Sequence, residues 1–489
     1  MKKCFIAILF LQFSLSSIAQ ASFELIFGEP EINENCTQTL EHQGYYYSLG
    51  SKGVSPENYR AMVLYKISYD GQIIGQVQFP KPDTSYGINF GIPKANGNIL
   101  CFGTLGHEPY PSQRRYTYVC EISPELELVW ERMDSIVESH PLARHRLNTI
   151  MLTPDNEVIL QGRLDTVEYG SNAFLFFAKY DLGGNRLGYT SFINYVDRNR
   201  GSLMLNEDGS GFFLFGQLSV GRSSRNWIEF DFDFNYLDSG RLETHHGPPL
   251  IWSPATARWV SSGNFILANS YEIPGTNEKG LEMRLFDSGK QLLKSTAIYH
   301  DKDIRIPEYK GMGFIDENFI WVATFEPLLP DFTGEEKIKF FVFDNEINLK
   351  GSMTYEGGIR YWLWDLLATS DTACLITGVV GENPGVNMFT DNYLKKIRLD
   401  DVVTGIINQD WKVGSTIEIW PVPAGETLHV KSSIDSELLV LNGIGQHISV
   451  HSIRKGYNLI SLTNLSPGIF FIAVKQNKNI IETHKLIKQ

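Results

Sequence analysis

Histidine and aromatic residues gather between the apolar runs of this chain, and their side chains are the ones suited to chemistry. Imidazoles and carboxylates exchange protons near neutral pH, and aromatic rings fit sugar rings or protein hot spots. The candidates for a ligand-binding face are His107, Tyr110, His140, His145, Tyr195, His245, His246, Trp252, His300 and Tyr309. Carboxylates in the same segments include Asp134, Glu138, Asp197, Asp301, Asp303, Glu326 and Asp331.

No catalytic or metal-binding motif stands out among these residues. His245 and His246 are neighbours and lack the i, i+4 spacing of helical zinc sites. His300 and Asp301 are also adjacent, and adjacent side chains on a strand point to opposite faces. No nucleophile elbow, phosphate loop or dinucleotide fingerprint is evident. The sequence therefore predicts no catalytic residues, no metal and no cofactor, and it favours a protein that is not an enzyme.

The segments that must position these side chains form a sequence repeat with seven copies. Each copy has an apolar run ending near a small residue, a long loop, a second apolar run and a short turn. The first runs lie at 45–50, 99–103, 158–162, 212–216, 265–269, 319–324 and 374–378. Their ends recur about every 54 residues, and a period near 50 is typical of propellers or solenoids.

Each copy fills four strands, as the second one illustrates. Its strands are expected at 88–92, 98–103, 116–122 and 126–132, with an Asn-Gly turn after the first. Third strands alternate with period two, and second strands are almost wholly apolar, as in strands buried on both faces. One such sheet cannot bury both faces alone. We expect an all-β fold, a seven-bladed β-propeller of four-stranded blades, with an open stack of sheets as the alternative.

The segment 23–28 resembles a fourth strand without a repeat before it, whereas the seventh copy has only a weak candidate for its own fourth strand. We predict that 23–28 pairs into the last blade and closes the ring, which would remove an exposed sheet edge. The alternative is a frayed N-terminus.

Loop lengths indicate where a ligand would bind. Loops from second to third strands are long, as are many links between blades, whereas the other turns are short. Because strand direction alternates, both long classes emerge on one side, where function concentrates on a rigid scaffold. The alternative is that loop aromatics only brace their own loops. Asp and Gly at the short turns suggest calcium, but hairpin chemistry already explains them.

The first residues and the net charge indicate the compartment and the class of partner. Residues 1–21 have a charged start, a short apolar stretch and a small-residue cleavage site, as in a secretory signal. No later apolar run is long enough to span a bilayer, so no transmembrane segment is expected after cleavage. The net charge of −13 argues against nucleic acid as a partner, since binding phosphates requires clustered cations.

Four cysteines follow the signal: Cys36, Cys101, Cys120 and Cys374. They show no CxxC spacing, which argues against zinc. Cys101 and Cys120 are expected on neighbouring strands of one repeat. An export route permits a disulfide between them, and buried free thiols are the favoured alternative.

The last 75 or so residues differ from the repeats and read as a small module of short strands after a linker at 402–414. An apolar strand runs into a Pro-x-Pro element, and later strands carry a Gly turn, a Leu-x-x-Gly strand and a basic end. The residues concerned are Pro421, Pro423, Gly445, Leu465, Gly468, Lys485 and Lys488.

This module resembles the C-terminal sorting domain of the type IX (Por) secretion system of Bacteroidota. Val422 replaces the central Asn of the family's Pro-Asn-Pro, and Phe470 stands where Tyr is common. The resemblance implies a small β-sandwich at 415–489, the secretion machinery as partner, and passage across the outer membrane to a secreted or surface-attached location. The alternative is an adhesive β-sandwich that stays on the protein.

Taken together, the sequence predicts a signal peptide (1–21), a β-propeller (22–401), a linker and a sorting domain (415–489). Its expected function is non-enzymatic: a cell-surface or extracellular protein that binds a glycan or protein through the long-loop face. The alternatives are a secreted polysaccharide hydrolase or lyase, with loop histidines and carboxylates as acid and base, and a structural part of a surface assembly.

Overall fold

A computed structural model describes the chain from residue 22 to residue 488 with internal gaps, and the expected signal segment lies outside it. The gaps are 30, 55–58, 80–83, 108–114, 135–143, 166–172, 198–200, 221–222, 244–255, 273–277, 301, 327–335, 358–359, 382–389, 403–416, 421–425, 433, 443–446 and 477–478. Among the described residues, no helix has the length and hydropathy needed to span a bilayer.

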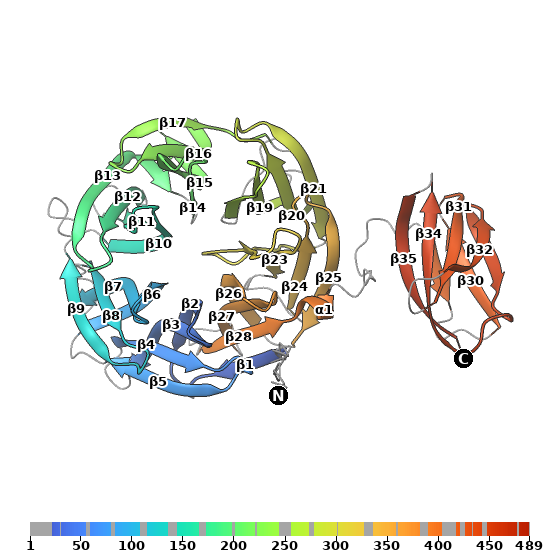
Figure 1. Cartoon of the computed structure of the whole chain (residues 1–489), viewed down its shortest axis with the longest axis horizontal. Coiled ribbons are helices and arrows are strands. Elements are labelled where there is room, and N and C mark those ends of the chain that lie inside the picture. The colour runs from blue at the N-terminus through green and yellow to red at the C-terminus, as the bar shows by residue number, and fades with distance from the viewer. Residues whose placement is uncertain are drawn as a thin grey trace, which may run out of the picture.

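Strands make up nearly all of the described secondary structure, as predicted, and the one helix, α1, is a single turn (Leu399–Val402). Up to α1 there are five four-stranded sheets and one eight-stranded sheet. Figure 1 shows them around a ring, with the first strand of each group toward the middle and the last at the outside. Repeated four-stranded units in this arrangement are those of a β-propeller-like fold.

Four of the sheets consist of consecutive strands. They are β2 (Glu34–His42), β3 (Tyr45–Val54), β4 (Tyr59–Ile67) and β5 (Ile73–Phe79); β6 (Thr84–Pro93), β7 (Ile99–His107), β8 (Arg115–Ile122) and β9 (Leu128–Asp134); β18 (Thr256–Trp259), β19 (Phe265–Glu272), β20 (Lys279–Phe286) and β21 (Leu292–His300); and β22 (Met312–Gly313), β23 (Ile320–Phe325), β24 (Lys337–Phe343) and β25 (Leu349–Glu356).

The eight-stranded sheet is made of two such groups in sequence. Its strands are β10 (Arg144–Leu152), β11 (Val158–Asp165), β12 (Ala173–Tyr180), β13 (Arg186–Asp197), β14 (Ser202–Leu205), β15 (Gly211–Val220), β16 (Ser223–Asp231) and β17 (Tyr236–Gly240). The two groups are joined where the end of β13 pairs with the end of β15, while β14 pairs with β15 from its own group.

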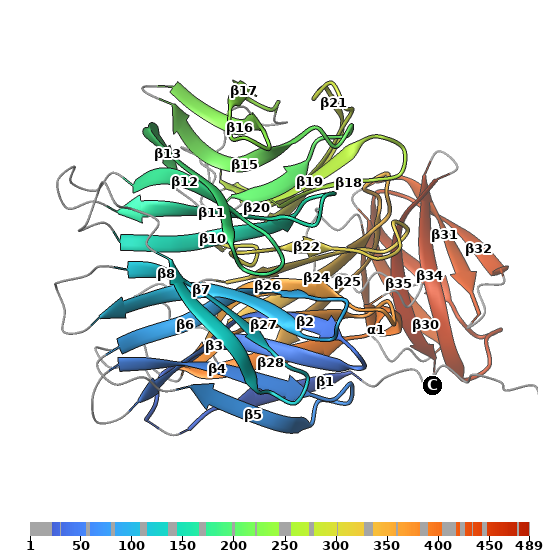
Figure 2. The same ribbon diagram turned by 60° about the vertical axis from the view of Figure 1, so that its left-hand side comes forward.

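Apolar side chains from neighbouring sheets pack into common cores, so a single sheet could not bury its apolar faces alone. Phe90 and Leu100 of one sheet cluster with Leu160 and Phe176 of the next, and Figure 2 shows the strands β6–β8 beside β10–β12. The second strands β19 and β27 are buried at every position but the last. The prediction that second strands are covered on both faces is confirmed for these two.

Short turns follow the chemistry that the sequence indicated. In the turn between β12 and β13, Asp181 Oδ1 accepts hydrogen bonds from the backbone N–H groups of Gly183 (2.9 Å) and Asn185 (2.8 Å). Asp231 and Asp344 do the same in the equivalent turns of two other repeats. The aspartates are therefore engaged in shaping hairpins.

Hydrogen bonds between sheets repeat with the period of the sequence. Ser202 Oγ accepts from the backbone N–H of Ala257 (3.1 Å), and Thr256 Oγ1 accepts from that of Gly311 (2.9 Å). Each bond joins residues 55 positions apart, which is one repeat. Hydroxyls at the start of the innermost strand thus fix the next sheet in the same register.

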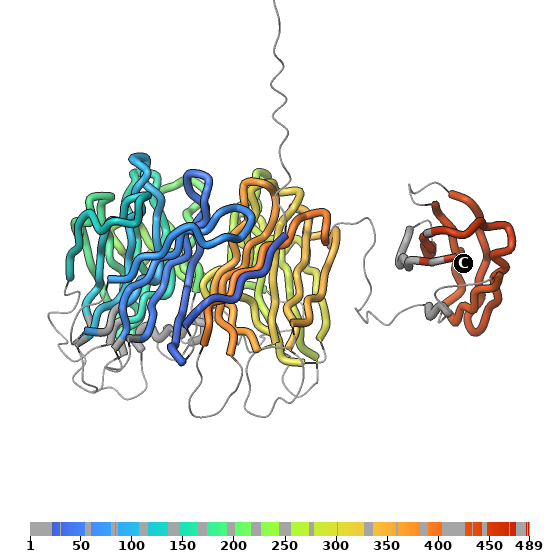
Figure 3. The backbone as a smooth tube through the Cα atoms, turned by 90° about the horizontal axis from the view of Figure 1, so that it is seen from below, coloured from blue at the N-terminus to red at the C-terminus, as the bar shows by residue number. Residues whose placement is uncertain are grey.

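The last sheet contains β26 (Arg360–Ala368), β27 (Cys374–Gly381), β28 (Asp391–Ile397) and, from the other end of the chain, β1 (Phe23–Phe27). β1 runs antiparallel to β28, with Leu25 opposite Leu394. Figure 3 shows the blue β1 against the orange β28. The predicted pairing of 23–28 with the last repeat is confirmed.

A buried carboxylate reinforces this closure. Glu34 of β2 is fully buried, and its Oε2 accepts hydrogen bonds from Tyr65 Oη (2.6 Å) and Asn392 Nδ2 (2.7 Å). Its Oε1 lies 3.1 Å from Lys52 Nζ. Because a buried charge is tolerated only when paired, Glu34 ties the first sheet to β28.

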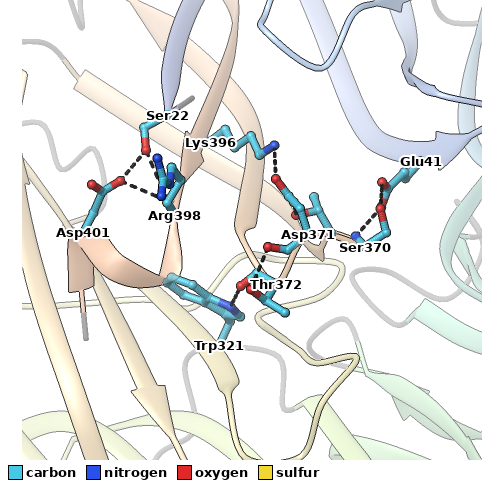
Figure 4. Close-up of polar contacts among 10 residues, drawn as sticks. Ser22, Glu41, Trp321, Ser370, Asp371, Thr372, Lys396, Arg398 and Asp401 are labelled. Carbon is cyan, nitrogen blue, oxygen red and sulfur yellow. Dashed lines mark hydrogen bonds and ion pairs between the residues drawn. The ribbon is translucent and has the colours of Figure 1, made fainter. Parts of the chain in front are cut away.

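Figure 4 shows a second group of polar contacts at the same joint. Lys396 Nζ lies 2.7 Å from Asp371 Oδ2, and the Lys396 side chain is fully buried. Burial acts to raise the pKa of Asp371, but hydrogen bonds from Lys396 and Thr369 hold it below its usual value. The neighbouring Ser370 hydroxyl donates a hydrogen bond to Glu41 of β2. This bond connects the last sheet to the first.

The cysteines after the expected signal are all buried free thiols, the alternative that the sequence favoured. Cys101 of β7 lies directly opposite Cys120 of β8. The expected placement of this pair on neighbouring strands is confirmed.

The C-terminal segment forms two further sheets around one core. One has the order β29 (Ile417–Trp420), β30 (Thr427–Ser432), β33 (Gly456–Ser461), and the other β32 (His447–Ile453), β31 (Ser436–Leu441), β34 (Gly468–Gln476), β35 (Asn479–Lys488). Leu428 and Ile460 of the first sheet cluster with Val440 and Ile472 of the second.

Of the predicted sorting residues, Leu465 packs on this core, Gly468 opens β34, and Lys485 and Lys488 lie on β35. Pro421, Pro423 and Gly445 lie outside the described residues.

The ring closure can be tested with two adjacent residues of β1. Phe27 is buried, with its ring centroid 4.7 Å from that of Tyr65, whereas Ile26 is 46% exposed. We expect Phe27→Ala to lower the free energy of unfolding by about 3 kcal/mol, as for other buried aromatic truncations, and Ile26→Ala to have little effect. Urea unfolding of the full chain measures both. Equal losses would contradict closure by β1.

Candidate functional site

The structure places only part of the predicted ligand face. Tyr110, His140, His245, His246 and Trp252 lie outside the described residues. His107, His145 and Tyr195 lie near strand ends, on β7, β10 and β13, where only the backbone is described. His300 and Tyr309 are the two candidates whose side chains are described.

His300 is the last residue of β21 and is buried, not presented to solvent. Its Nδ1 lies 3.4 Å from Lys339 Nζ on the neighbouring sheet. Nearby, Lys302 Nζ lies 3.0 Å from Glu326 Oε2, and Glu326 directly follows β23. A partly buried group of charges therefore lies where the end of β21 meets the sheet β22–β25.

Glu336, just before β24, belongs to the same group and is almost fully buried. Its Oε2 accepts a hydrogen bond from the backbone N–H of Tyr361 (2.9 Å), and its Oε1 has no hydrogen-bond partner among the described residues. Burial raises the pKa of Glu336, and Glu326 adds to the shift, while the Tyr361 N–H and Arg360 oppose it. Glu336 is thus an acid biased toward its protonated form, beside an ion-paired carboxylate.

Residues 302–311, here called the cross-channel segment, lead from β21 to β22 along the inner edge of the last sheet. Arg305 exchanges two backbone hydrogen bonds with Phe325 (2.9 and 2.8 Å). The backbone N–H of Tyr309 then donates to Trp364 O on β26 (2.7 Å). In Figure 1 the yellow chain next to β23 reaches toward the middle of the ring. Backbone pairing therefore carries this segment from β23 of one sheet to β26, the innermost strand of the next.

Tyr309 brings together sheets from opposite parts of the sequence. Its ring centroid lies 5.0 Å from that of Phe90 on β6 in an edge-on arrangement, and 5.8 Å from that of Trp364. Trp364 lies 5.9 Å from Trp362, whose ring also faces the Arg305 guanidinium at 5.3 Å. Tyr309, Trp362 and Trp364 are each only partly buried. They form an aromatic row, which we call the axial row.

Behind the axial row lies an acid with a strongly shifted pKa. Asp365 is 3% exposed, and burial raises its pKa from the usual 3.8 to about 6, although Lys310 acts in the opposite direction. Burial also lowers the pKa of Lys310, against the influence of Asp365. The Asp365 and Lys310 backbones are paired as a bridge. The charges therefore help to seat the cross-channel segment on β26.

This arrangement offers aromatic faces, cations and a buried acid near one another, without a metal site. Among the described residues, no group of three His, Cys, Asp or Glu side chains is placed to hold a metal ion. Aromatic planes flanked by polar groups suit sugar rings or protein side chains. The chemistry available is ligand binding, and Glu336 and Asp365 are described acids whose raised pKa values suit proton transfer.

Sequence reasoning found Tyr309 and Glu326 but missed Glu336, Lys310, Trp362, Trp364 and Asp365. Trp362, Trp364 and Asp365 lie on β26, the first strand of its sheet, where aromatics are expected in a core. The available signal was the spacing of Trp362 and Trp364, two residues apart on a strand, which places them on one face. Their approach to Tyr309 depends on the cross-channel segment, which no local pattern reveals.

Comparison with known proteins identifies one part of the chain. Residues 418–489 match the family model described as a secretion system C-terminal sorting domain. No curated protein sequence matches the chain.

Solved structures similar to the ring are remote in sequence. A polysaccharide lyase of family PL25, an ulvan lyase, has 11% identity, a TM-score of 0.46, and coverage of 77% of this chain and 99% of its own. The WD40 domain of SCAP from fission yeast has 10% identity, a TM-score of 0.35, and coverage of 77% and 98%. The β-propeller domain of the trilobed protease from Pyrococcus furiosus has 9% identity, a TM-score of 0.34, and coverage of 70% and 88%. None of these similarities carries a function to this chain.

The buried acid gives a test of the axial site through pH. Because the folded-state pKa of Asp365 lies above its unfolded value, this group's contribution is most favourable below about pH 4 and is lost as pH rises through about 6. The shift corresponds to roughly 3 kcal/mol at one pKa unit per 1.36 kcal/mol. We expect Asp365→Asn to abolish this component in urea unfolding measured between pH 4 and 7.

Lys310→Met provides the matched control for that experiment. Without the cation, the pKa of Asp365 should rise further, so the loss of stability should move to higher pH. Identical pH profiles for the native chain and Asp365→Asn would show that Asp365 is not buried as described.

Proposed function

Residues 418–489 of this chain match a secretion system C-terminal sorting domain, that of the type IX system. On this basis we propose that the protein is exported and binds a glycan. The sorting domain implies the type IX machinery as partner and a cell-surface or extracellular location. The proposed parts are a signal peptide at 1–21, a propeller at 22–401, a linker at 402–414 and a small β-sandwich at 415–489.

The ring is proposed to have seven four-stranded blades. Support comes from the eight-stranded sheet, whose halves β10–β13 and β14–β17 each have the strand order of the other units. Among the described strands, the backbone pairing between the halves is limited to Tyr195–Asp197 against Leu218–Val220. β1 then supplies the fourth strand of the seventh blade.

The observation that supports ligand binding is the partly exposed axial row of Tyr309, Trp364 and Trp362. Aromatic rings of this kind are costly to leave exposed unless they meet a partner, and their flat faces match the C–H faces of sugar rings. Arg360, two residues before Trp362 on β26, adds a cationic side chain to the same strand. A glycan chain would lie across the axis on the long-loop side.

One observation favours a second candidate, a polysaccharide hydrolase or lyase. Glu336, with its raised pKa, is suited to donate a proton, and a second carboxyl group, that of Glu326, lies in the same group of charges, ion-paired with Lys302. A pair of carboxyl groups, one of which donates a proton, is the usual equipment for cleaving a glycosidic bond.

Binding and cleavage can be separated with the full exported chain. We expect Trp364→Ala to weaken binding on a glycan array by about tenfold or more, because hot-spot aromatics contribute more than the 1.4 kcal/mol that corresponds to tenfold. Trp364→Phe should retain most of the affinity. Tyr236→Ala, a 45% exposed aromatic on the outer strand β17, is the control and should bind normally.

The same polysaccharides are assayed for new reducing ends. None should form if the protein only binds. Release that disappears in Glu336→Gln would instead establish the second candidate, and unchanged binding by Trp364→Ala would remove the axial row from the proposal.

A further inference from the structure

The C-terminal domain exposes large apolar side chains on two edge strands. Those exposed by more than a third in its described part are Ile448 and Val450 on β32, and Tyr457 and Leu459 on β33. Single exposed apolar residues are ordinary on a protein surface, but four within twelve positions of a small domain indicate an interaction surface.

β33 presents the more exposed pair and has a free edge. Tyr457 is 61% and Leu459 60% exposed, compared with 43% for Ile448 and 48% for Val450. The strand order β29-β30-β33 leaves the second edge of β33 without a partner among the described strands. An edge strand with apolar side chains is a template for a strand of another protein.

Alternation on β33 fixes which side chains face outward. Ile460 is buried in the core shared with the other sheet, so Tyr457 and Leu459, offset by odd numbers of residues, lie on the outer face. Tyr457 hydrogen-bonds His429 of β30, with ring centroids 5.7 Å apart, and Leu459 lies opposite His429 in register. These three residues, here called the β33 patch, form one continuous surface.

We propose that the β33 patch is the surface by which the type IX secretion machinery recognises this protein. The domain that carries the patch matches a secretion sorting domain, so the partner that must recognise it is the outer-membrane machinery. Tyrosine is favoured at interface hot spots because it combines a large apolar face with a hydroxyl. The occupant is a strand edge of a secretion component, which would extend the β29-β30-β33 sheet.

The secretion machinery could bind the β33 patch without unfolding the domain. None of the three side chains belongs to the core cluster of Leu428, Val440 and Ile472. Recognition can therefore use side chains that contribute little to domain stability, and their replacement should leave the fold intact.

The test uses the full chain in a bacterium with a type IX system, comparing the amounts in the periplasm and in the medium or on the cell surface. Tyr457→Ser/Leu459→Ser should lower the exported fraction by about tenfold or more, the loss expected when a hot spot worth over 1.4 kcal/mol is removed. The matched control is Ile448→Ser/Val450→Ser on β32, which should be exported normally. Purified variants should keep the native thermal unfolding midpoint.

Each other outcome overturns the proposal. Normal export of the β33 variant would show that the patch is not read by the machinery, and an export defect confined to the β32 variant would move the docking surface to the other sheet. A lowered unfolding midpoint of the ring in the β33 variant would assign the patch to an intramolecular contact. Glycan binding by the purified variants is measured separately, so failure of the proposed function leaves this result distinguishable.

Discussion

The architecture depends on the pairing of β1 with β28. Each sheet has two apolar faces and can bury them only against neighbours, so a ring without this pair would leave the last sheet incomplete. Buried polar groups join the first sheet to the last: fully buried Glu34 of β2 is hydrogen-bonded to Tyr65 in its own sheet and to Asn392 of β28. Such groups are destabilising when unpaired, so they also penalise any arrangement in which the two chain ends separate.

Closure has consequences at the axis. The innermost strands face one another across the ring, and the cross-channel segment is drawn over them by backbone hydrogen bonds to Leu363 and Trp364. Tyr309 then contacts Phe90 from a sheet more than 200 residues earlier in the chain. The partly exposed aromatic row and the buried Asp365 exist only because the ring holds these strands in place.

The C-terminal domain has a different relation between stability and function. Its core residues come from both sheets and resemble those of any small β domain, whereas its apolar surface lies on edge strands that stable domains usually protect. The proposed recognition by the secretion machinery would explain why such a surface is retained, since a signal read by another protein must remain accessible.

The sequence by itself determined the strands, the repeat, the closing role of 23–28 and the identity of the tail, because period-two alternation, turn residues and motif order are local properties. It also placed Tyr309 among the candidates. Only the tertiary structure decided that His300 is buried, that Tyr309 meets Trp364 and Phe90, and that Glu336 and Asp365 are shifted acids. Those properties arise from desolvation and from contacts between distant segments. The spacing of residues along the chain predicts neither of them.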